Sequence, residues 1–345
     1  MYNTKIQVNV SKKEKFFMIK CTIAIPVYNR EKFIGRAIDS ALAQNVSDLE
    51  VLVVDNCSTD HTWEVLHTYR DSRLRLVRNE TNLGLFGNFN CCLSLAKGKY
   101  LRFLCSDDTL VAGTLKREIA VMDAHPHVAL LSTRGQRMDE EGNFLGFQAD
   151  HFKQGVYSGN KSIYAILWYQ AYYAYNSLNY PSGILIRRDF SEQVGQFDVN
   201  MKMLGDVDFF LRVLEHGDLA VLNTLGCNIT IHVNQQSSYL LGDKSPMLEL
   251  NFLIERYKLL LQQEGGYERI KQQMMAHVLG LAFKYWRIGL KDAYHFHCEI
   301  VRRSGIQKIK VFMAILRLIS LRLLLKTTGI RFLPVHSVSC LKSSP

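Results

Sequence analysis

Acidic side chains follow two segments of this chain that have the composition of buried β-strands. Asp55 comes directly after the apolar run 49–54, and Asp107 and Asp108 follow the run 100–104. Carboxylates gathered at one site repel one another and lose solvation, so they stay ionised only beside a cation or hydrogen-bond donors. Aspartate oxygens suit Mg²⁺ or Mn²⁺, ions that commonly bind one or two carboxylates together with substrate phosphates. The pattern therefore indicates a site for a nucleoside diphosphate and a divalent metal.

Each acidic segment also has a simpler interpretation. The Asp107-Asp108 pair could cap the next helix, and residues 55–60 could form an ordinary turn. A third expected strand, 22–25, runs directly into the segment 26–29. In an open parallel α/β sheet, ligands bind where the carboxyl ends of the strands meet. All three segments are therefore expected to face one crevice.

Many short motifs resemble, in order and spacing, those of the family 2 glycosyltransferases of the GT-A fold, over residues 21–232. The matching residues are Ile25-Pro26-Val27-Tyr28-Asn29-Arg30, Ser40 with Gln44, 50–55 with Ser58-Thr59-Asp60, Asn82-Leu83-Gly84 with Asn88, 96–100, Phe103-Leu104 leading to Asp107-Asp108, Pro181-Ser182-Gly183, Gly195-Gln196-Phe197-Asp198 and Asp206-Val207-Asp208 with Arg212. No single motif is decisive, but the ordered set is highly specific. The resemblance implies direct displacement with inversion, one base and no covalent intermediate.

The chain departs from the family pattern at two acidic motifs. The usual Asp-x-Asp-Asp is Cys105-Ser106-Asp107-Asp108 here, so the first carboxylate is missing and metal coordination should rest on Asp107, with Asp108 as a helper. The usual Glu-Asp pair is Gly205-Asp206, of which only the aspartate remains. That aspartate resembles the family's catalytic base, although it could also cap the helix that it begins.

The resemblance also implies roles for other positions. Asp55 would accept a hydrogen bond from the nucleobase, typically uracil. His232 stands where related enzymes often have a histidine near the diphosphate, so it is a candidate ligand for Mn²⁺ beside Asp107, although a structural histidine fits equally well. The implied donor-binding residues are Pro26, Val27, Tyr28, Asp55, Ser106, Asp107 and Asp108.

Hydrophobic periodicity predicts the elements that position these residues. Strand-like runs at 22–27, 49–54, 74–78, 99–105 and 128–133 alternate with helical patterns at 31–44, 62–70, 87–96 and 114–125. Such alternation predicts an α/β fold with a mostly parallel, doubly wound sheet flanked by helices. We expect a GT-A domain at 21–232, between a basic N-terminal extension (1–20) and a mostly helical, basic C-terminal region (233–345). The aromatic segment 164–180 could be a core helix or a wall facing sugars.

Composition and charge narrow the function classes. The 345 residues are 48% hydrophobic, and the net charge of +10 is concentrated at the ends: residues 1–20 carry +4 and those after 299 carry +9, leaving −3 for the rest. A nucleic-acid-binding protein would have its basic residues clustered on the folded domain, so nucleic acid is not an expected partner. The eight cysteines lack C-x-x-C spacing, which favours free thiols in a reducing compartment.

The C-terminal region has an amphipathic pattern. Between Ile306 and Lys326, apolar residues recur every three or four positions and alternate with cations that include Lys310, Arg317, Arg322 and Lys326, but no apolar run is long enough to span a bilayer. This segment could lie on an anionic membrane or pack on the catalytic domain. No signal peptide is apparent near the N-terminus. We therefore expect a cytoplasmic protein, peripheral at the cytoplasmic face of the membrane.

These observations predict a glycosyltransferase that moves a sugar from a nucleotide-diphosphate donor, UDP-linked by family resemblance, to a hydroxyl of a glycan or lipid-linked acceptor in cell-surface polysaccharide synthesis. Two alternatives stay open. The missing first carboxylate would suit a non-catalytic nucleotide-sugar-binding scaffold. A sugar-1-phosphate nucleotidyltransferase shares a similar sheet, but the segment Pro26-Val27-Tyr28-Asn29-Arg30 lacks the glycines of its phosphate loop.

Overall fold

The computed structural model describes residues 19–148, 152–173, 177–232 and 245–287, with a few positions between 291 and 302. The N-terminal extension and the amphipathic segment 306–326 lie outside the described residues, so the expectations for them stay predictions. The strands are β1 (Cys21–Val27), β2 (Leu49–Asp55), β3 (Leu74–Arg78), β4 (Tyr100–Phe103), β5 (Thr109–Leu110), β6 (Val128–Met138), β7 (Phe144–Gln148), β8 (Gly155–Tyr157), β9 (Ile184–Arg187) and β10 (Asp218–Thr230).

One sheet contains all of these strands, in the order β3-β2-β1-β4-β9-β6-β10-β5, with β7 on β6 and β8 on β10. Strands β1 to β4, β6 and β10 point the same way, whereas β9 runs antiparallel between β4 and β6. The expected alternation of strands and helices is confirmed for the first half of the chain. The antiparallel β9 was not predicted, because its four residues, three of them apolar, carry no periodicity of their own.

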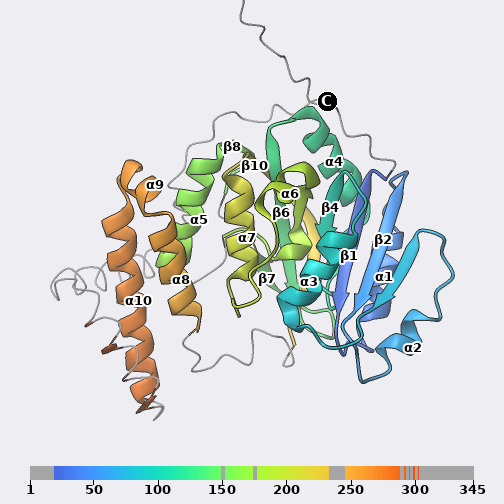
Figure 1. The fold of residues 1–345 in the computed structure, drawn as a ribbon, viewed down its shortest axis with the longest axis horizontal. Coiled ribbons are helices and arrows are strands. Elements are labelled where there is room, and N and C mark those ends of the chain that lie inside the picture. The colour runs from blue at the N-terminus through green and yellow to red at the C-terminus, as the bar shows by residue number, and fades with distance from the viewer. Residues whose placement is uncertain are drawn as a thin grey trace, which may run out of the picture.

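Helices cover both faces of the sheet (Figure 1). Their bounds are α1 (Ile34–Leu42), α2 (Thr62–Leu66), α3 (Gly84–Leu95), α4 (Thr114–Ala124), α5 (Gly159–Tyr173), α6 (Arg188–Val194), α7 (Gly205–Leu214), α8 (Ser245–Arg256), α9 (Lys258–Gln263) and α10 (Tyr267–Arg287). One apolar cluster lies between the sheet and α1 and α4, and the other lies among the sheet, α3, α5, α7, α8 and α10.

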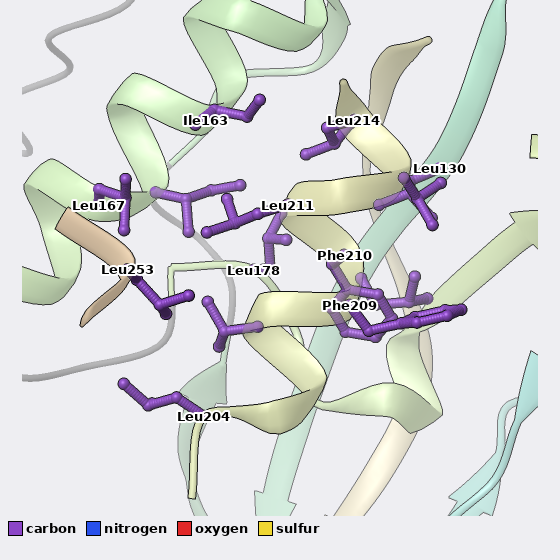
Figure 2. Packing of buried hydrophobic residues seen from close by; sticks show 14 of the residues in the cluster. Leu130, Ile163, Leu167, Leu178, Leu204, Phe209, Phe210, Leu211, Leu214 and Leu253 are labelled. Atoms are coloured by element: carbon purple, nitrogen blue, oxygen red, sulfur yellow. The ribbon is translucent and has the colours of Figure 1, made fainter. Parts of the chain in front are cut away.

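Helix α7 stands at the centre of the larger cluster. Its residues Phe210 and Leu211 are fully buried and point toward Leu130 of β6, Ile163 of α5 and Leu253 of α8 (Figure 2). The cluster continues into α10 and therefore crosses residue 232, the expected end of the GT-A domain. The division at that residue stays a prediction.

The aromatic residues of α5 belong to this core. Trp168, Tyr169 and Tyr172 are between 2% and 8% exposed, which supports the core helix rather than the sugar-facing wall. The cysteines in the described part of the chain are free thiols. Among the described residues, no helix is long and apolar enough to cross a membrane.

Candidate active site

The loops after β1 and β2 are tied together at the carboxyl edge of the sheet. Asn29 has a left-handed backbone (φ 51°), which asparagine tolerates, and its N–H donates to Ser58 Oγ at 2.9 Å. In return, Asn29 Oδ1 accepts the N–H of Thr59 at 2.8 Å. Pro26 and Val27 are buried within β1, whereas Tyr28 is 40% exposed. Of the expected donor-binding residues in this loop, Tyr28 is thus the one whose side chain reaches solvent.

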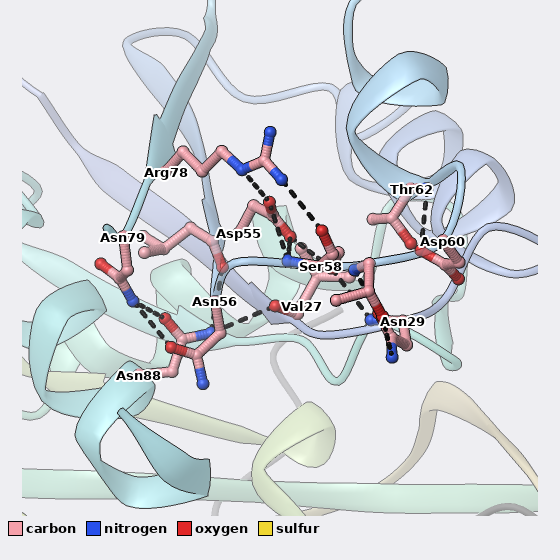
Figure 3. A network of polar contacts seen from close by, with 12 residues as sticks. Val27, Asn29, Asp55, Asn56, Ser58, Asp60, Thr62, Arg78, Asn79 and Asn88 are labelled. Carbon is pink, nitrogen blue, oxygen red and sulfur yellow. Dashed lines mark hydrogen bonds and ion pairs between the residues drawn. The ribbon is translucent and has the colours of Figure 1, made fainter. Parts of the chain in front are cut away.

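Asp55 is fully buried at the end of β2 and has two partners there. Arg78 Nε lies 3.1 Å from its Oδ2, and the Ser58 hydroxyl donates to its Oδ1 (Figure 3). The Arg78 guanidinium also donates to the Ser58 carbonyl and lies 5.0 Å from the centre of the Trp63 ring. The side chain of Arg78 is half-exposed, whereas the Asp55 carboxylate with which it forms the ion pair is fully buried.

A network of asparagine amides holds the neighbouring loops. Asn79 Nδ2 donates to Asn56 Oδ1 and Asn88 Oδ1, both at 3.0 Å, and Asn88 Nδ2 donates to the carbonyl of Val54. Asn56 Nδ2 donates to Asn82 Oδ1 at 2.9 Å (Figure 3 shows Asn56, Asn79 and Asn88). These contacts connect β2, the loop after β3 and the start of α3, so the asparagines of the sequence motif have a structural role.

Asp108 is a buried scaffold for the second acidic loop. Its Oδ2 accepts the Ser182 hydroxyl at 2.6 Å and its Oδ1 accepts the N–H of Thr230 at 2.9 Å. Burial, followed by the charge of Asp107, holds the pKa of Asp108 well above its usual value. The next element is strand β5, and α4 begins only at Thr114 after Gly113, so the simpler interpretation of this pair as a helix cap is wrong.

Asp107 remains partly exposed and meets His232. Its Oδ2 lies 2.9 Å from His232 Nε2 and 3.8 Å from Arg30 Nε. The His232 ring stacks on Phe33 with centroids 4.8 Å apart, and Arg36 donates to the Asp107 carbonyl at 2.9 Å. The side chain of Ser106, the remaining residue expected in this loop, is buried.

Asp107 and His232 are hydrogen-bond partners at a distance that adjacent metal ligands would also have. Adjacent ligands of an octahedral ion at about 2.1 Å lie about 3.0 Å apart, close to the 2.9 Å between Asp107 Oδ2 and His232 Nε2. In the described part of the chain, no group of three or more His, Cys, Asp or Glu side chains could hold a metal ion. Two protein ligands would leave the other coordination positions to phosphate oxygens and water, which is how Mg²⁺ is usually bound beside a nucleotide.

Asp206 lies in the first turn of α7 and is partly exposed. The helix cap residue is Leu204, and the Asp206 carboxylate instead accepts the N–H of Val207 at 2.8 Å. Burial is the main reason why the pKa of Asp206 is raised to about 6; backbone N–H groups of Val207 and Asp206 lower it, and the negative charge of Glu249 makes a smaller raising contribution. Asp208, two residues on, is buried and paired with Arg212 and Arg256, so it is not available as a base.

Tyr180 lies within electrostatic range of both Asp206 and the second acidic loop. Its pKa is raised mainly by burial; Arg137 lowers it, and the charges of Asp206 and Asp108 raise it. The charge of Asp206 also acts on the Cys105 thiol at the start of the loop. The structure thus brings Asp206 into the electrostatic neighbourhood of Asp107 and Asp108. Sequence reasoning missed Tyr180, Ser182, Thr230 and Arg78 as site residues, since these polar side chains are distant in the chain from the residues they contact.

The mostly parallel sheet, its flanking helices and the acidic loops at its carboxyl edge are those of an α/β protein of the GT-A fold. The family model for glycosyl transferase family 2 matches residues 22–194, and the chain belongs to this family. A relative from Escherichia coli, the UDP-Glc:alpha-D-GlcNAc-diphosphoundecaprenol beta-1,3-glucosyltransferase WfaP, is 36% identical over 102 residues, which are 30% of this chain and 41% of that protein.

Another relative is the poly(ribitol-phosphate) beta-N-acetylglucosaminyltransferase TarS of Staphylococcus aureus, 37% identical over 118 residues, 33% of this chain and 21% of TarS. The chain therefore matches less than half the length of either relative. The crystal structure of TarS 1–349 in complex with UDP-GlcNAc aligns with a TM-score of 0.57 at 20% identity, over 84% of this chain and 93% of that one.

A mannosyltransferase from Pyrobaculum calidifontis in complex with GDP-Man and Mn²⁺ aligns with a TM-score of 0.53 at 16% identity, over 92% of this chain and 85% of that chain. At these identities, the two structures establish the GT-A fold.

Proposed function

We propose that the protein is an inverting glycosyltransferase that transfers a sugar from a UDP-linked donor to a hydroxyl group of a glycan or lipid-linked acceptor in cell-surface polysaccharide synthesis. The observation that carries the proposal is that Asp206, whose pKa is raised to about 6, and Asp107, which pairs with His232, both act electrostatically on the Cys105 thiol at the start of the second acidic loop. The printed names of WfaP and of the TarS complex, which specify UDP-sugars, support a UDP-linked donor.

Residues of the loop after β1 would hold the donor together with the two acidic loops. Tyr28 presents an exposed ring, and Arg30 brings a positive charge to within 3.8 Å of Asp107, where it can also attract a diphosphate. Asp55 is expected to recognise the nucleobase of the donor. Because Asp55 is fully buried, the nucleobase could reach it only if the half-exposed Arg78 moved aside.

A divalent ion held by Asp107 and His232 would neutralise the charge that develops on the diphosphate leaving group. We propose Mn²⁺ or Mg²⁺, and the Mn²⁺ complex of the archaeal mannosyltransferase is consistent with that choice. Asp108 is buried and already bonded through both oxygens, so its contribution would be to hold the loop rather than to bind the ion directly.

Asp206 would act as the general base. An acceptor hydroxyl that attacks the anomeric carbon from the face opposite the diphosphate must lose its proton during the attack, and a carboxylate can accept it. A base works best when its pKa lies near the operating pH, and the burial of Asp206 moves its pKa in that direction. This arrangement requires no covalent sugar intermediate.

The amphipathic segment 306–326 would hold the enzyme at the cytoplasmic face of an anionic membrane, where a lipid-linked acceptor is available. The function is tested by incubating the full-length protein with a panel of nucleotide sugars and Mn²⁺ and measuring donor hydrolysis and thermal shift. We expect one UDP-sugar to raise the melting temperature and to be hydrolysed slowly without acceptor. If all donors of the panel bind without any turnover, even with glycan acceptors, a binding scaffold replaces the enzyme.

A further inference from the structure

Glu249 of α8 reaches the segment that precedes α7. Its Oε1 accepts the N–H of Lys202 at 2.7 Å, and its Oε2 accepts the N–H groups of Met203 at 3.0 Å and Leu204 at 2.8 Å. Three consecutive backbone donors therefore end on one carboxylate. Leu204 is the cap residue of α7, and Asp206 follows two positions later.

Two further polar contacts hold α8 along α7. Arg256 donates to Asp208 at 3.1 Å, and the hydroxyl of Tyr257 donates to Glu215 at the other end of α7. Leu253 and Ile254 of α8 are fully buried in the apolar cluster that also contains α7. The contacts of Arg256 and Tyr257 involve the middle and the C-terminal end of α7, whereas Glu249 contacts the residues directly before Asp206.

The same segment also forms the wall of a cleft. Val199, Met201 and Lys202 face Leu83 and Phe86 across a volume of about 220 Å³. A methyl group at Gly205 would lie 2.5 Å from the Phe86 ring, so the start of α7 is packed tightly against this cleft. A shift of the 199–204 segment would therefore move both the cleft wall and the first turn of α7.

We propose that Glu249 is a positioning residue for the reaction: by holding the three amides before α7, it fixes the place from which Asp206 meets the acceptor hydroxyl. The inference rests on the proposed function of Asp206. It assigns a part in the reaction to helix α8, which lies beyond the family match at 22–194. Glu249 does not touch the substrate in this scheme and acts through the backbone.

The test compares Glu249→Gln with Glu255→Gln in the full-length protein. Glu255 lies on the same helix but pairs with Lys271 and Tyr267, away from α7. An amide can accept through its oxygen but not through its nitrogen, so Glu249→Gln loses part of the three-amide contact. Hydrogen exchange should accelerate at 202–204 in Glu249→Gln and stay at the wild-type rate in Glu255→Gln.

The kinetic measurement uses the best donor of the panel. We expect kcat of Glu249→Gln to fall about 10-fold to 100-fold with little change in the donor KM, because misplacement of a reacting group mainly affects the chemical step. The acid limb of the kcat profile should move to lower pH. The negative charge of Glu249 is a smaller cause than burial of the raised pKa of Asp206, and the variant removes that charge. The other titratable groups near Asp206, namely Cys105, Tyr180 and Asp108, are unchanged in this variant.

The proposal is overturned if Glu249→Gln exchanges faster at 202–204 but keeps the kcat and the acid limb of the wild type. It is also overturned if exchange at 202–204 does not change. Asp206→Asn, assayed in parallel, separates this failure from that of the proposed function: if Asp206→Asn keeps wild-type turnover, the base itself has been assigned wrongly, whereas an inactive Asp206→Asn beside a fully active Glu249→Gln refutes the positioning role alone.

Discussion

Asp107 and His232 are separated by 125 positions in the chain, and their Oδ2 and Nε2 atoms lie 2.9 Å apart. The pairing depends on β10, which runs beside β6 and brings His232 to the edge where β4 and its acidic loop end. Arg36 and Thr230 bind the Asp107 carbonyl, so the loop is held from both sides. The pair is thus a product of the strand order rather than of local sequence.

Removing either member of this pair should abolish or weaken metal-dependent donor binding. Asp107→Ala should eliminate the Mn²⁺-dependent thermal shift with UDP-sugar, because the neighbouring Cys105 cannot replace its carboxylate. His232→Ala should weaken the shift, and the exposed His127→Ala should leave it unchanged. Wild-type Mn²⁺ dependence in Asp107→Ala would show that the metal site lies elsewhere.

Asp206→Asn should lower kcat by about 10² to 10⁴ while donor affinity changes only a few-fold, which is the usual contribution of one general base. The amide keeps the shape of the side chain and its contact with Val207. Wild-type kcat should rise as pH increases through about 6, because the active form of Asp206 is the carboxylate. Steady-state kinetics from pH 5 to 9, with the exposed Asp189→Asn as a matched control, measures both effects. Turnover in Asp206→Asn equal to that of Asp189→Asn would exclude this residue as the base.

Ionised Asp206 should lower the free energy of unfolding at a pH above about 6. The pKa of Asp206 is raised from 3.8 to about 6 in the folded protein, so folding favours its protonated form. The resulting stabilisation is complete below about pH 4 and is lost as pH rises through 6, with an upper limit of about 3 kcal/mol. We expect Asp206→Asn to have a higher Tm than the wild type at pH 8 and an equal Tm at pH 4. A Tm difference that is independent of pH would contradict this.

Arg78→Met should destabilise the protein by about 2 to 3 kcal/mol, since it leaves the buried carboxylate of Asp55 without its charged partner. Arg73→Met is the matched control, because Arg73 pairs with Asp71 at the surface and such pairs contribute at most about 1 kcal/mol. Urea denaturation of both variants measures the difference. Equal midpoints for the two would show that Asp55 does not depend on Arg78.

The basic tail should bind anionic vesicles if its charges and its apolar stripe act together. Each cation near such a surface contributes about 1 kcal/mol before screening. Replacement of Lys310, Arg317, Arg322 and Lys326 by Gln should release the full-length protein from phosphatidylserine-containing vesicles in co-sedimentation, and added salt should weaken wild-type binding. Unchanged co-sedimentation of the substituted protein would favour the packing interpretation of this segment.

Short local patterns predicted the first half of the fold because its strands and helices alternate with clear periodicity. The strand ends at Val27 and Asp55 were correct within one residue, and the loop motifs indicated a candidate site. Where tertiary contacts decide, the sequence left alternatives open. The aromatic segment 164–180 could be a core helix or a sugar-facing wall, and the burial of Trp168 and Tyr172 supports the core helix.

Pairings across long sequence distances were equally invisible. Nothing in the sequence shows that Ser182 and Thr230 donate hydrogen bonds to the two carboxylate oxygens of Asp108. The sequence therefore could not show that Asp108 is buried and structural whereas Asp107 is partly exposed. Asp55 was expected to bind the nucleobase; it is fully buried beside Arg78 of β3, and its role in binding stays a prediction. Residue types and order indicated a candidate site, whereas the exposure of each carboxylate required the packed structure.

The apolar cluster that α7 shares with α8 and α10 limits how this enzyme could be recombined with its relatives. A chimera that exchanged everything after residue 232 would replace Glu249, Leu253 and Arg256 in one step, and with them the surface on which α7 rests. Exchange of acceptor-recognition segments between family members would therefore succeed more readily when the crossover falls after α10. The N-terminal part of such a hybrid would then keep helix α7, which carries Asp206, together with the helices on which it packs.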